Sequence, residues 1–114
     1  MKIIISESQY NKLMEGYVNF PIEDDISLEV WEDEEKLELE SIVIPKNLRG
    51  QGKGSEIMYM VCDYADEKQK PLYLTPDTSF GATSVDRLKR FYKKFGFTKN
   101  KDFKVRHSMV RYPQ

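Results

Sequence analysis

The chain has 114 residues, of which 39% are hydrophobic, and a formal net charge of -1 at pH 7. We expect a single domain over residues 1–114, because this length supports one core and is too short for two. Residues 23–40 are strongly acidic and would repel nucleic acid, which disfavours general nucleic-acid binding. No apolar run is long enough to cross a membrane and no secretory segment follows Met1, so we expect a cytoplasmic protein with neither nucleic acid nor membrane as partner.

Cys62 is the one cysteine of the chain, and His107 is the one histidine. A single cysteine excludes an internal disulfide and fits a reducing compartment. Apolar residues at Met58, Val61 and Ala65 recur at helical spacing around Cys62, which favours a buried structural thiol over a nucleophile. Because Cys62 and His107 are far apart and form no recognisable ligand cluster, the sequence predicts no metal site.

The first third of the chain predicts one helix and three short strands. Ser6 caps the helix, which continues to about Glu15, and Gly16 stops it. Short β-branched or alternating runs are typical of strands, and we expect strands over 2–5, 17–20 and 26–31.

The stretch from Leu37 to Asp66 organises the rest of the chain. It reads as an alternating strand over 37–44, a basic glycine-rich loop over 49–54 and a helix over 55–66. Glycines at alternate positions let the backbone turn with its N–H groups inward, and the helix adds the positive end of its dipole. A loop of this kind between a strand and a helix is typical of a phosphate-binding site.

The common nucleotide-binding loops do not match this stretch. A Walker loop requires Ser or Thr directly after its lysine, whereas Gly54 follows Lys53. A dinucleotide fingerprint requires a third glycine three residues after the second, where this chain has Ser55 or Ile57, depending on the frame. A nucleotide phosphate is therefore the less favoured ligand.

After the loop region, the sequence predicts a second long helix between short strands. Ser84 is a good N-cap for a helix over 85–95, and Gly96 ends that helix. The strands are expected over 71–75, from Phe97 onward and over 103–112.

Two of these segments resemble motifs of one enzyme family. Arg49, Gly52 and Gly54 fill the pattern Arg-x-x-Gly-x-Gly, and residues 91–97 resemble a helix that ends in aromatic-Tyr-x-x-x-Gly-Phe. In this order they resemble the GNAT superfamily of acyl-CoA-dependent N-acetyltransferases, over about residues 37–112. The resemblance implies an α/β fold with a mixed, largely antiparallel central sheet flanked by helices. The pyrophosphate-binding loop would lie between the fourth strand and the following helix.

The resemblance also implies a reaction. An acetyl group would pass from acetyl-CoA, as cosubstrate, to a primary amine by direct attack in a ternary complex, without a covalent enzyme intermediate. We expect a lysine or N-terminus of a protein or peptide as acceptor, since the short N-terminal region implies an open acceptor surface. The opening over 5–10 resembles small phage-encoded members, which implies host proteins as targets. A monomer or a homodimer is expected.

The family motifs assign candidate residues to cofactor binding. Loop N–H groups would bind the pyrophosphate, and the end of the preceding strand would pair with the pantetheine arm. The cofactor-binding residues expected on this basis are Ile42, Val43, Ile44, Arg49, Gly50, Gln51, Gly52, Lys53, Gly54 and Ser55. The sequence departs from the family pattern at Val85, where many members carry an Asn that contacts CoA. The neighbouring Ser84 could make that contact instead.

Tyr92 matches the family's tyrosine that donates a proton to the CoA thiolate. A phenol with an ordinary pKa of about 10 can donate to a thiolate without being ionised at pH 7. The alternative is that Tyr92 is one more aromatic side chain packed between helix and sheet.

Glu38 and Glu40 are the candidates for the general base. They lie two apart on the central strand and so face the same side. Glu38 has the spacing from Arg49 at which some protein-acetylating GNAT members carry their glutamate base. Two alternatives stay open: both glutamates are solvent-facing, with no side-chain base, or the chain is a non-catalytic acyl-CoA-binding or protein-interaction module with a GNAT fold.

Overall fold

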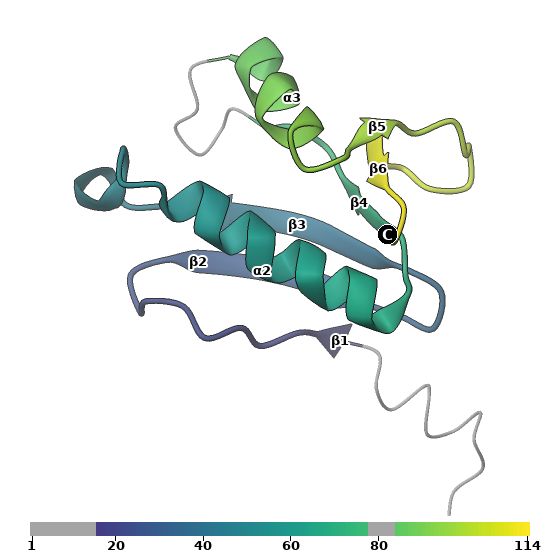
Figure 1. Ribbon diagram of the computed structural model, residues 1–114, viewed down its shortest axis with the longest axis horizontal. Helices are drawn as coiled ribbons and strands as arrows, with labels where there is room; N and C mark the ends of the chain where they lie inside the picture. Colours follow the sequence, from purple (N-terminus) through teal and green to yellow (C-terminus); the bar gives the residue numbers. More distant parts are fainter. Residues whose placement is uncertain (1–15, 78–83) are drawn as a thin grey trace, which may run out of the picture.

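The computed structural model describes residues 16–77 and 84–114, which form a mixed sheet covered by helices (Figure 1). Within these described ranges, six strands lie in the order β1-β2-β3-β4-β6-β5. Within the described residues, β3 and β4 are the one parallel pair, so the predicted mixed, largely antiparallel sheet is confirmed. In chain order the elements are β1 (Gly16–Tyr17), β2 (Ser27–Glu32), β3 (Leu37–Val43), the 3-10 helix η1 (Lys46–Leu48), α2 (Lys53–Lys68), β4 (Leu72–Leu74), α3 (Val85–Lys93), β5 (Thr98–Lys99) and β6 (Met109–Arg111).

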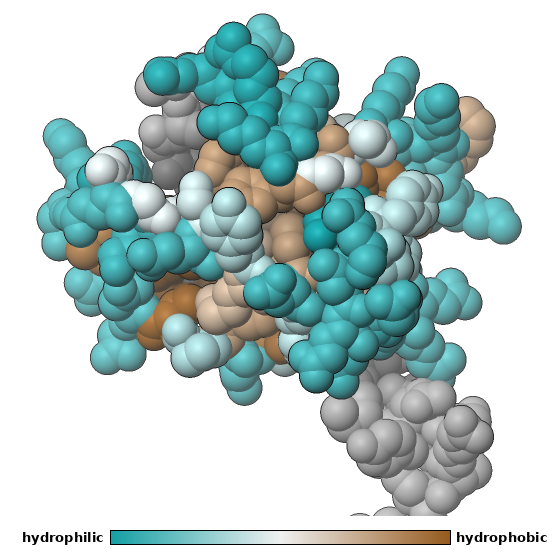
Figure 2. Space-filling model, viewed as in Figure 1, coloured by the Kyte–Doolittle hydropathy of each residue, from teal (hydrophilic) through white to brown (hydrophobic). Residues whose placement is uncertain are grey.

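Helix α2 joins the two parallel strands, β3 and β4. Neighbouring parallel strands need a crossover connection, because a tight turn reverses the chain direction and can join only antiparallel strands. Figure 1 shows α2 lying along β2 and β3, and Figure 2 shows that hydrophilic residues cover most of the same face. Leu37 and Leu39 of β3 are buried with Met58 and Val61 of α2 in one apolar core. Because side chains alternate along a strand, Glu38, which lies between these leucines, faces away from α2.

Beyond Leu39 the strands β3 and β4 no longer pair. Their register runs from Leu37 opposite Leu72 to Leu39 opposite Leu74, where β4 ends. Strand β3 continues to Val43, paired with β2 alone. The backbone of β3 is therefore released from β4 at the end that leads into the glycine loop.

Arg111 ties the last strand to α2 and to the end of α3. Its guanidinium donates to both carboxylate oxygens of Asp66, at 2.7 and 3.0 Å, and its Nε donates to the carbonyl of Phe95 at 2.6 Å. The backbone N–H of Gln114 donates to the same carboxylate at 3.0 Å. A charge-assisted, two-pronged contact of this kind is among the stronger polar interactions in proteins.

Several predicted boundaries are wrong in detail. The strand predicted over 17–20 is only two residues long and begins at Gly16, although the N–H of Val18 still donates to the carbonyl of Val30. The strand predicted to start at Phe97 begins one residue later, and the strand predicted over 103–112 is reduced to three residues.

Local hydrogen bonds explain the short last strand. The side-chain amide of Asn100 donates to three carbonyls between 102 and 107, and the carboxylate of Asp102 accepts from the N–H of Lys104. These contacts hold the segment in turns, because side chains that bond the nearby backbone compete with the sheet ladder. The expected strand over 2–5 and helix over 6–15 lie outside the described residues. Among the described residues, no helix combines the length and apolar character needed to cross a bilayer.

Candidate active site

The glycine loop turns directly into the first turn of α2. Gly50 and Gly52 both have φ of +77°, a left-handed conformation that glycine adopts at no steric cost. Gly52 is the N-cap of α2, which begins at Lys53, two residues earlier than predicted. A Cβ atom at Gly50 or Gly52 would meet no described atom within 4 Å, so space remains above the loop. The first N–H groups of a helix have no intrahelical acceptors and suit an anion there.

Gly54 brings three elements together beside this loop. A Cβ atom at this position would lie 3.6 Å from Phe91 of α3 and 3.7 Å from Ile44, just after β3. A side chain larger than alanine would therefore push these groups apart. The start of α2 thus packs against α3, the helix that carries Tyr92.

Both cations of the loop have protein partners. Arg49 donates from Nε to the carbonyl of Ile44 at 2.9 Å. The ammonium of Lys53 lies 2.6 Å from a carboxylate oxygen of Glu23 and 3.7 Å from one of Glu56. The hydrogen bond with Glu23 raises the pKa of Lys53, which keeps its charge. A pyrophosphate at the loop would compete with Glu23 for this charge.

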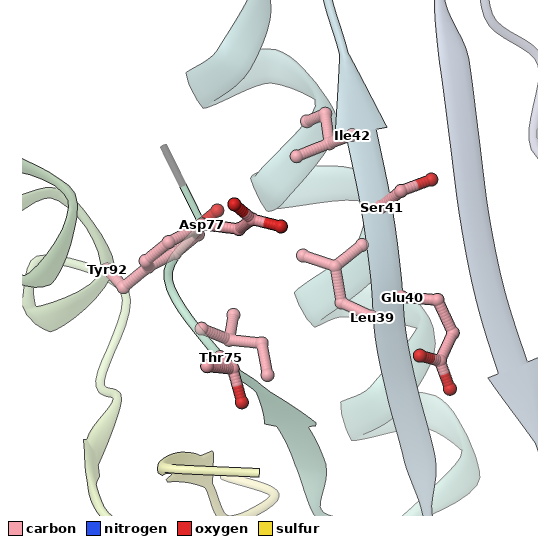
Figure 3. A pocket seen from close by; sticks show the side chains of 8 residues that line it. Leu39, Glu40, Ser41, Ile42, Thr75, Asp77 and Tyr92 are labelled. Atoms are coloured by element: carbon pink, nitrogen blue, oxygen red, sulfur yellow. The ribbon is translucent and has the colours of Figure 1, made fainter. Parts of the chain in front are cut away.

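A cavity of about 30 Å³ opens where β3 and β4 separate. Figure 3 shows Tyr92 and Asp77 on one side of it, with Leu39 and Ile42 projecting from β3 on the other. This volume holds about one water molecule. The cavity is lined by Leu39, Glu40, Ser41, Ile42, Leu74, Thr75, Asp77 and Tyr92.

Tyr92 is 6% exposed and packs edge-on against Phe91 and Phe97. Burial raises the pKa of Tyr92 to about 12. The phenol therefore keeps its proton at neutral pH, which is the form needed to protonate a leaving thiolate. A packing role and a proton-donor role are compatible for Tyr92, because its side chain belongs to the core and also lines the cavity.

Glu38 and Glu40 lie on the face of β3 opposite α2, next to residues that sequence reasoning missed. The ring nitrogen Nε2 of His107 lies 3.3 Å from Glu38, and Nδ1 lies 3.0 Å from the hydroxyl of Thr75. Glu40 is ion-paired with Arg106. Burial, followed by the positive charge of Arg106, lowers the pKa of His107, while Glu38 acts in the opposite direction. His107 is thus held mainly in its neutral form at pH 7.

The residues missed by sequence reasoning differ in how they could have been found. Thr75 and Asp77 follow β4 at the carboxyl end of a parallel strand pair. Ligand-binding residues are common at this position, so the strand prediction could have identified them as candidates. No sequence pattern could have identified His107, because it precedes β6 and lies 32 positions from Thr75, its hydrogen-bond partner.

Two other residues lie as the sequence suggests. Cys62 is buried, which raises its thiol pKa to about 11 and suits a structural residue. The Ser84 hydroxyl accepts from the N–H of Arg87 at 3.1 Å, which confirms the predicted N-cap. That hydroxyl therefore caps α3. A contact of Ser84 with CoA, in place of the missing Asn, would compete with this cap.

The comparisons with known proteins concern the family and the fold. The model of the acetyltransferase (GNAT) family matches residues 11–97. The chain belongs to the GNAT family. Members of this GNAT family transfer acetyl groups and generally use acetyl-CoA. A search of curated proteins gave no match.

Three solved structures share the GNAT fold with this chain. The anti-CRISPR protein AcrVA5 has a TM-score of 0.64 and 20% identity, covering 84% of this chain and 96% of its own. A GNAT-family protein from Bacteroides thetaiotaomicron has a TM-score of 0.58 and 19% identity, covering 82% and 60%. A protein from Agrobacterium tumefaciens assigned as an acetyltransferase has a TM-score of 0.53 and 17% identity, covering 96% and 95%. At these identities the likeness concerns the fold alone.

Proposed function

We propose that the protein transfers the acetyl group of acetyl-CoA to a primary amine on a protein or peptide, in a ternary complex. The observation that carries this proposal is that three features lie next to one another along β3 and the start of α2. The open glycine loop lies at the start of α2, the free end of β3 leads into it, and Tyr92 lines the cavity beside that strand. These features correspond to sites for pyrophosphate, pantetheine and thioester.

Cosubstrate binding rests mainly on backbone groups. The N–H groups of the loop and the first turn of α2 bind the pyrophosphate, with Arg49 and Lys53 as supporting charges. The released backbone of Ile42 to Ile44 pairs with the pantetheine arm. Binding in this position brings the thioester to the cavity, since both sites lie along the same strand.

The acetyl transfer needs a proton acceptor and a proton donor. A base on the open side of β3 takes a proton from the acceptor ammonium, and Glu38 is the candidate. The free amine attacks the thioester carbonyl, and the tetrahedral intermediate collapses with cleavage of the C–S bond. Tyr92 gives its proton to the departing thiolate, so that CoA leaves as the thiol, and the second proton lost by the attacking nitrogen restores the Tyr92 phenol, directly or through water.

Calorimetric titration of acetyl-CoA into the wild type and two Gly52 variants tests cosubstrate binding. Gly52→Glu places bulk and negative charge where the pyrophosphate is expected, and it should abolish the binding seen with the wild type. Gly52→Ala is the matched control, because it imposes the same strain at φ +77° without the charge. It should bind more weakly than the wild type but measurably. Absence of binding by the wild type itself would contradict the proposed enzyme.

A second candidate is a GNAT-fold module that binds acyl-CoA or a protein partner without catalysis. The observation that favours it is Val85 in place of Asn, with the neighbouring Ser84 engaged as a helix cap. A peptide and proteome acetylation screen separates the two candidates. Acetylated products that depend on Tyr92 support the enzyme, whereas tight CoA binding without any product supports the module.

A further inference from the structure

Three potential metal ligands gather on the open face of β3. One carboxylate oxygen each from Glu38 and Glu40 and one ring nitrogen of His107 lie within 4.8 Å of one another. The two glutamates project from the same side of one strand, and the histidine comes from the segment just before β6. The sequence spacing predicts no such cluster, because the fold brings together residues about 70 positions apart.

The ring nitrogen Nε2 of His107 is buried and points toward the two carboxylates, with no hydrogen-bond partner among the described residues. The residue is 5% exposed, and within the described residues its Nε2 makes no hydrogen bond. The 3.3 Å separation from Glu38 lacks the alignment of a hydrogen bond. Buried polar atoms are nearly always satisfied, since leaving one without a partner is costly. The arrangement therefore calls for a further group between Nε2 and the carboxylates.

We propose that Glu38, Glu40 and His107 form a binding site for one divalent transition-metal cation of the Zn²⁺ class. An imidazole nitrogen with two carboxylates suits such ions better than Mg²⁺ or Ca²⁺, which prefer oxygen ligands alone. Three protein ligands leave a position for water or substrate, as in catalytic zinc sites. The contact between Nδ1 and the Thr75 hydroxyl fixes the ring as outer contacts do in metal sites, with Nε2 left as the ligand.

Arg106 is the competitor that the cation must displace. Its guanidinium is paired with Glu40, but its side chain is 66% exposed. An ion pair of this exposure contributes little stability and is screened by salt. A divalent cation offers Glu40 a closer and larger positive charge, so the guanidinium moves into solvent when the ion binds.

Occupation of the site has a consequence that rests on the proposed function. A cation bound to Glu38 uses the lone pair that would take the proton of the acceptor ammonium. Zn²⁺ is therefore expected to inhibit acetyl transfer, and removal of the ion by a chelator restores it.

Absorption titration of the full chain with Co²⁺, a coloured substitute for Zn²⁺, tests the site without requiring activity. We expect visible bands that saturate at one ion per chain and disappear when Zn²⁺ is added. His107→Gln and Glu38→Gln should each weaken binding by about tenfold or more. Arg106→Ala should strengthen it about 1.5- to 5-fold, the equivalent of losing an exposed competing ion pair. Glu29→Gln, an exposed carboxylate on the neighbouring strand, is the matched control and should bind as the wild type does.

Thermal melts of each variant establish that it is folded at the titration temperature. Absence of saturable bands in the wild type, or equal binding by folded His107→Gln and Glu38→Gln, would overturn the metal site. Acetyl transfer by a wild type that binds no Co²⁺ would also overturn it and leave the proposed function intact. Binding at this cluster by a protein that acetylates nothing would support the metal site and contradict the proposed function.

Discussion

At the scale of single residues, Tyr92 and Glu38 divide the proposed chemistry between two environments. Tyr92 lies in the core and is kept protonated by burial, whereas Glu38 lies on the opposite side of β3 beside a neutral histidine. In the proposed reaction one group supplies a proton and the other accepts one, from the two faces of the same strand. Each assignment can be tested by an isosteric substitution.

Tyr92→Phe removes the proton donor and keeps the ring contacts with Phe91 and Phe97. We expect turnover to fall by about 10²- to 10⁴-fold, the usual contribution of a positioned acid, with the Kd for acetyl-CoA nearly unchanged. Because the pKa of Tyr92 is raised to about 12, ionisation of the wild-type phenol should not reduce kcat below about pH 10. Steady-state kinetics across pH and calorimetry measure both quantities. Unchanged turnover in the variant would remove the assigned role.

Glu38→Gln and Glu40→Gln distinguish the two candidate bases. If Glu38 is the base, its variant should lose about 10²-fold or more in kcat, whereas Glu40→Gln should lose much less. Both variants keep the shape of the side chain, and neither touches the glycine loop, so acetyl-CoA binding should be retained. Equal kinetics in all three proteins would show that the reaction uses no glutamate base.

At the scale of elements, α3 has to hold Tyr92 against the end of β3. This helix is nine residues long, which is marginal for a helix without tertiary contacts. Its N-terminus is capped by Ser84, and Gly96, with φ of +95°, lets the chain turn back toward β5. The position of Tyr92, and with it the proposed catalytic role, therefore depends on a local cap at one end and a tight turn at the other.

Ser84→Ala tests how far the cap supports α3. Loss of the hydroxyl leaves the N–H of Arg87 without its acceptor, and we expect a destabilisation of about 0.5–2 kcal/mol. Urea unfolding monitored by circular dichroism measures it. Ser84→Asp is the control that restores a capping oxygen, so it should recover most of the loss; an equal loss in both variants would contradict the cap as the cause.

At the scale of the whole molecule, one carboxylate joins the middle of the chain to its end. Asp66 on α2 accepts from Arg111 of β6 and from the N–H of Gln114, and Arg111 in turn donates to the carbonyl of Phe95. The Arg111 guanidinium holds the pKa of Asp66 below its usual range. A lowered carboxyl pKa adds stability above the ordinary value of about 4, and that stability is lost as pH falls through the folded-state pKa.

Asp66→Asn should therefore destabilise the protein in a pH-dependent way. At pH 7 we expect a loss of about 1–3 kcal/mol in the free energy of unfolding, typical of hydrogen bonds to a charged group. The difference from the wild type should shrink as pH falls below about 4, where the unfolded state takes up a proton, and should vanish below the lowered folded-state pKa, where Asp66 is protonated in both states. Denaturant unfolding at a series of pH values measures this. Asp63→Asn, an exposed change on the same helix, should cost less than about 0.5 kcal/mol throughout.

The sequence by itself determined the features that depend on near neighbours in the chain. The glycine loop, the strand and helix on either side of it, the Ser84 cap and the common face of Glu38 and Glu40 all follow from spacings of a few residues, and the structure agrees with each. The family resemblance rests on the same short motifs. Where local rules compete, as in the segment after Asn100, the predicted strand proved too long.

The tertiary structure alone decided which distant residues meet. The pairing of β3 with β4 and of β4 with β6 places His107 and Arg106 beside Glu38 and Glu40, and the fold brings Glu23 to Lys53. No periodicity reports such contacts, because they depend on strand order and register, which are set by the burial of the whole core. The glycine loop could therefore be anticipated, whereas the neighbours of the candidate base could not.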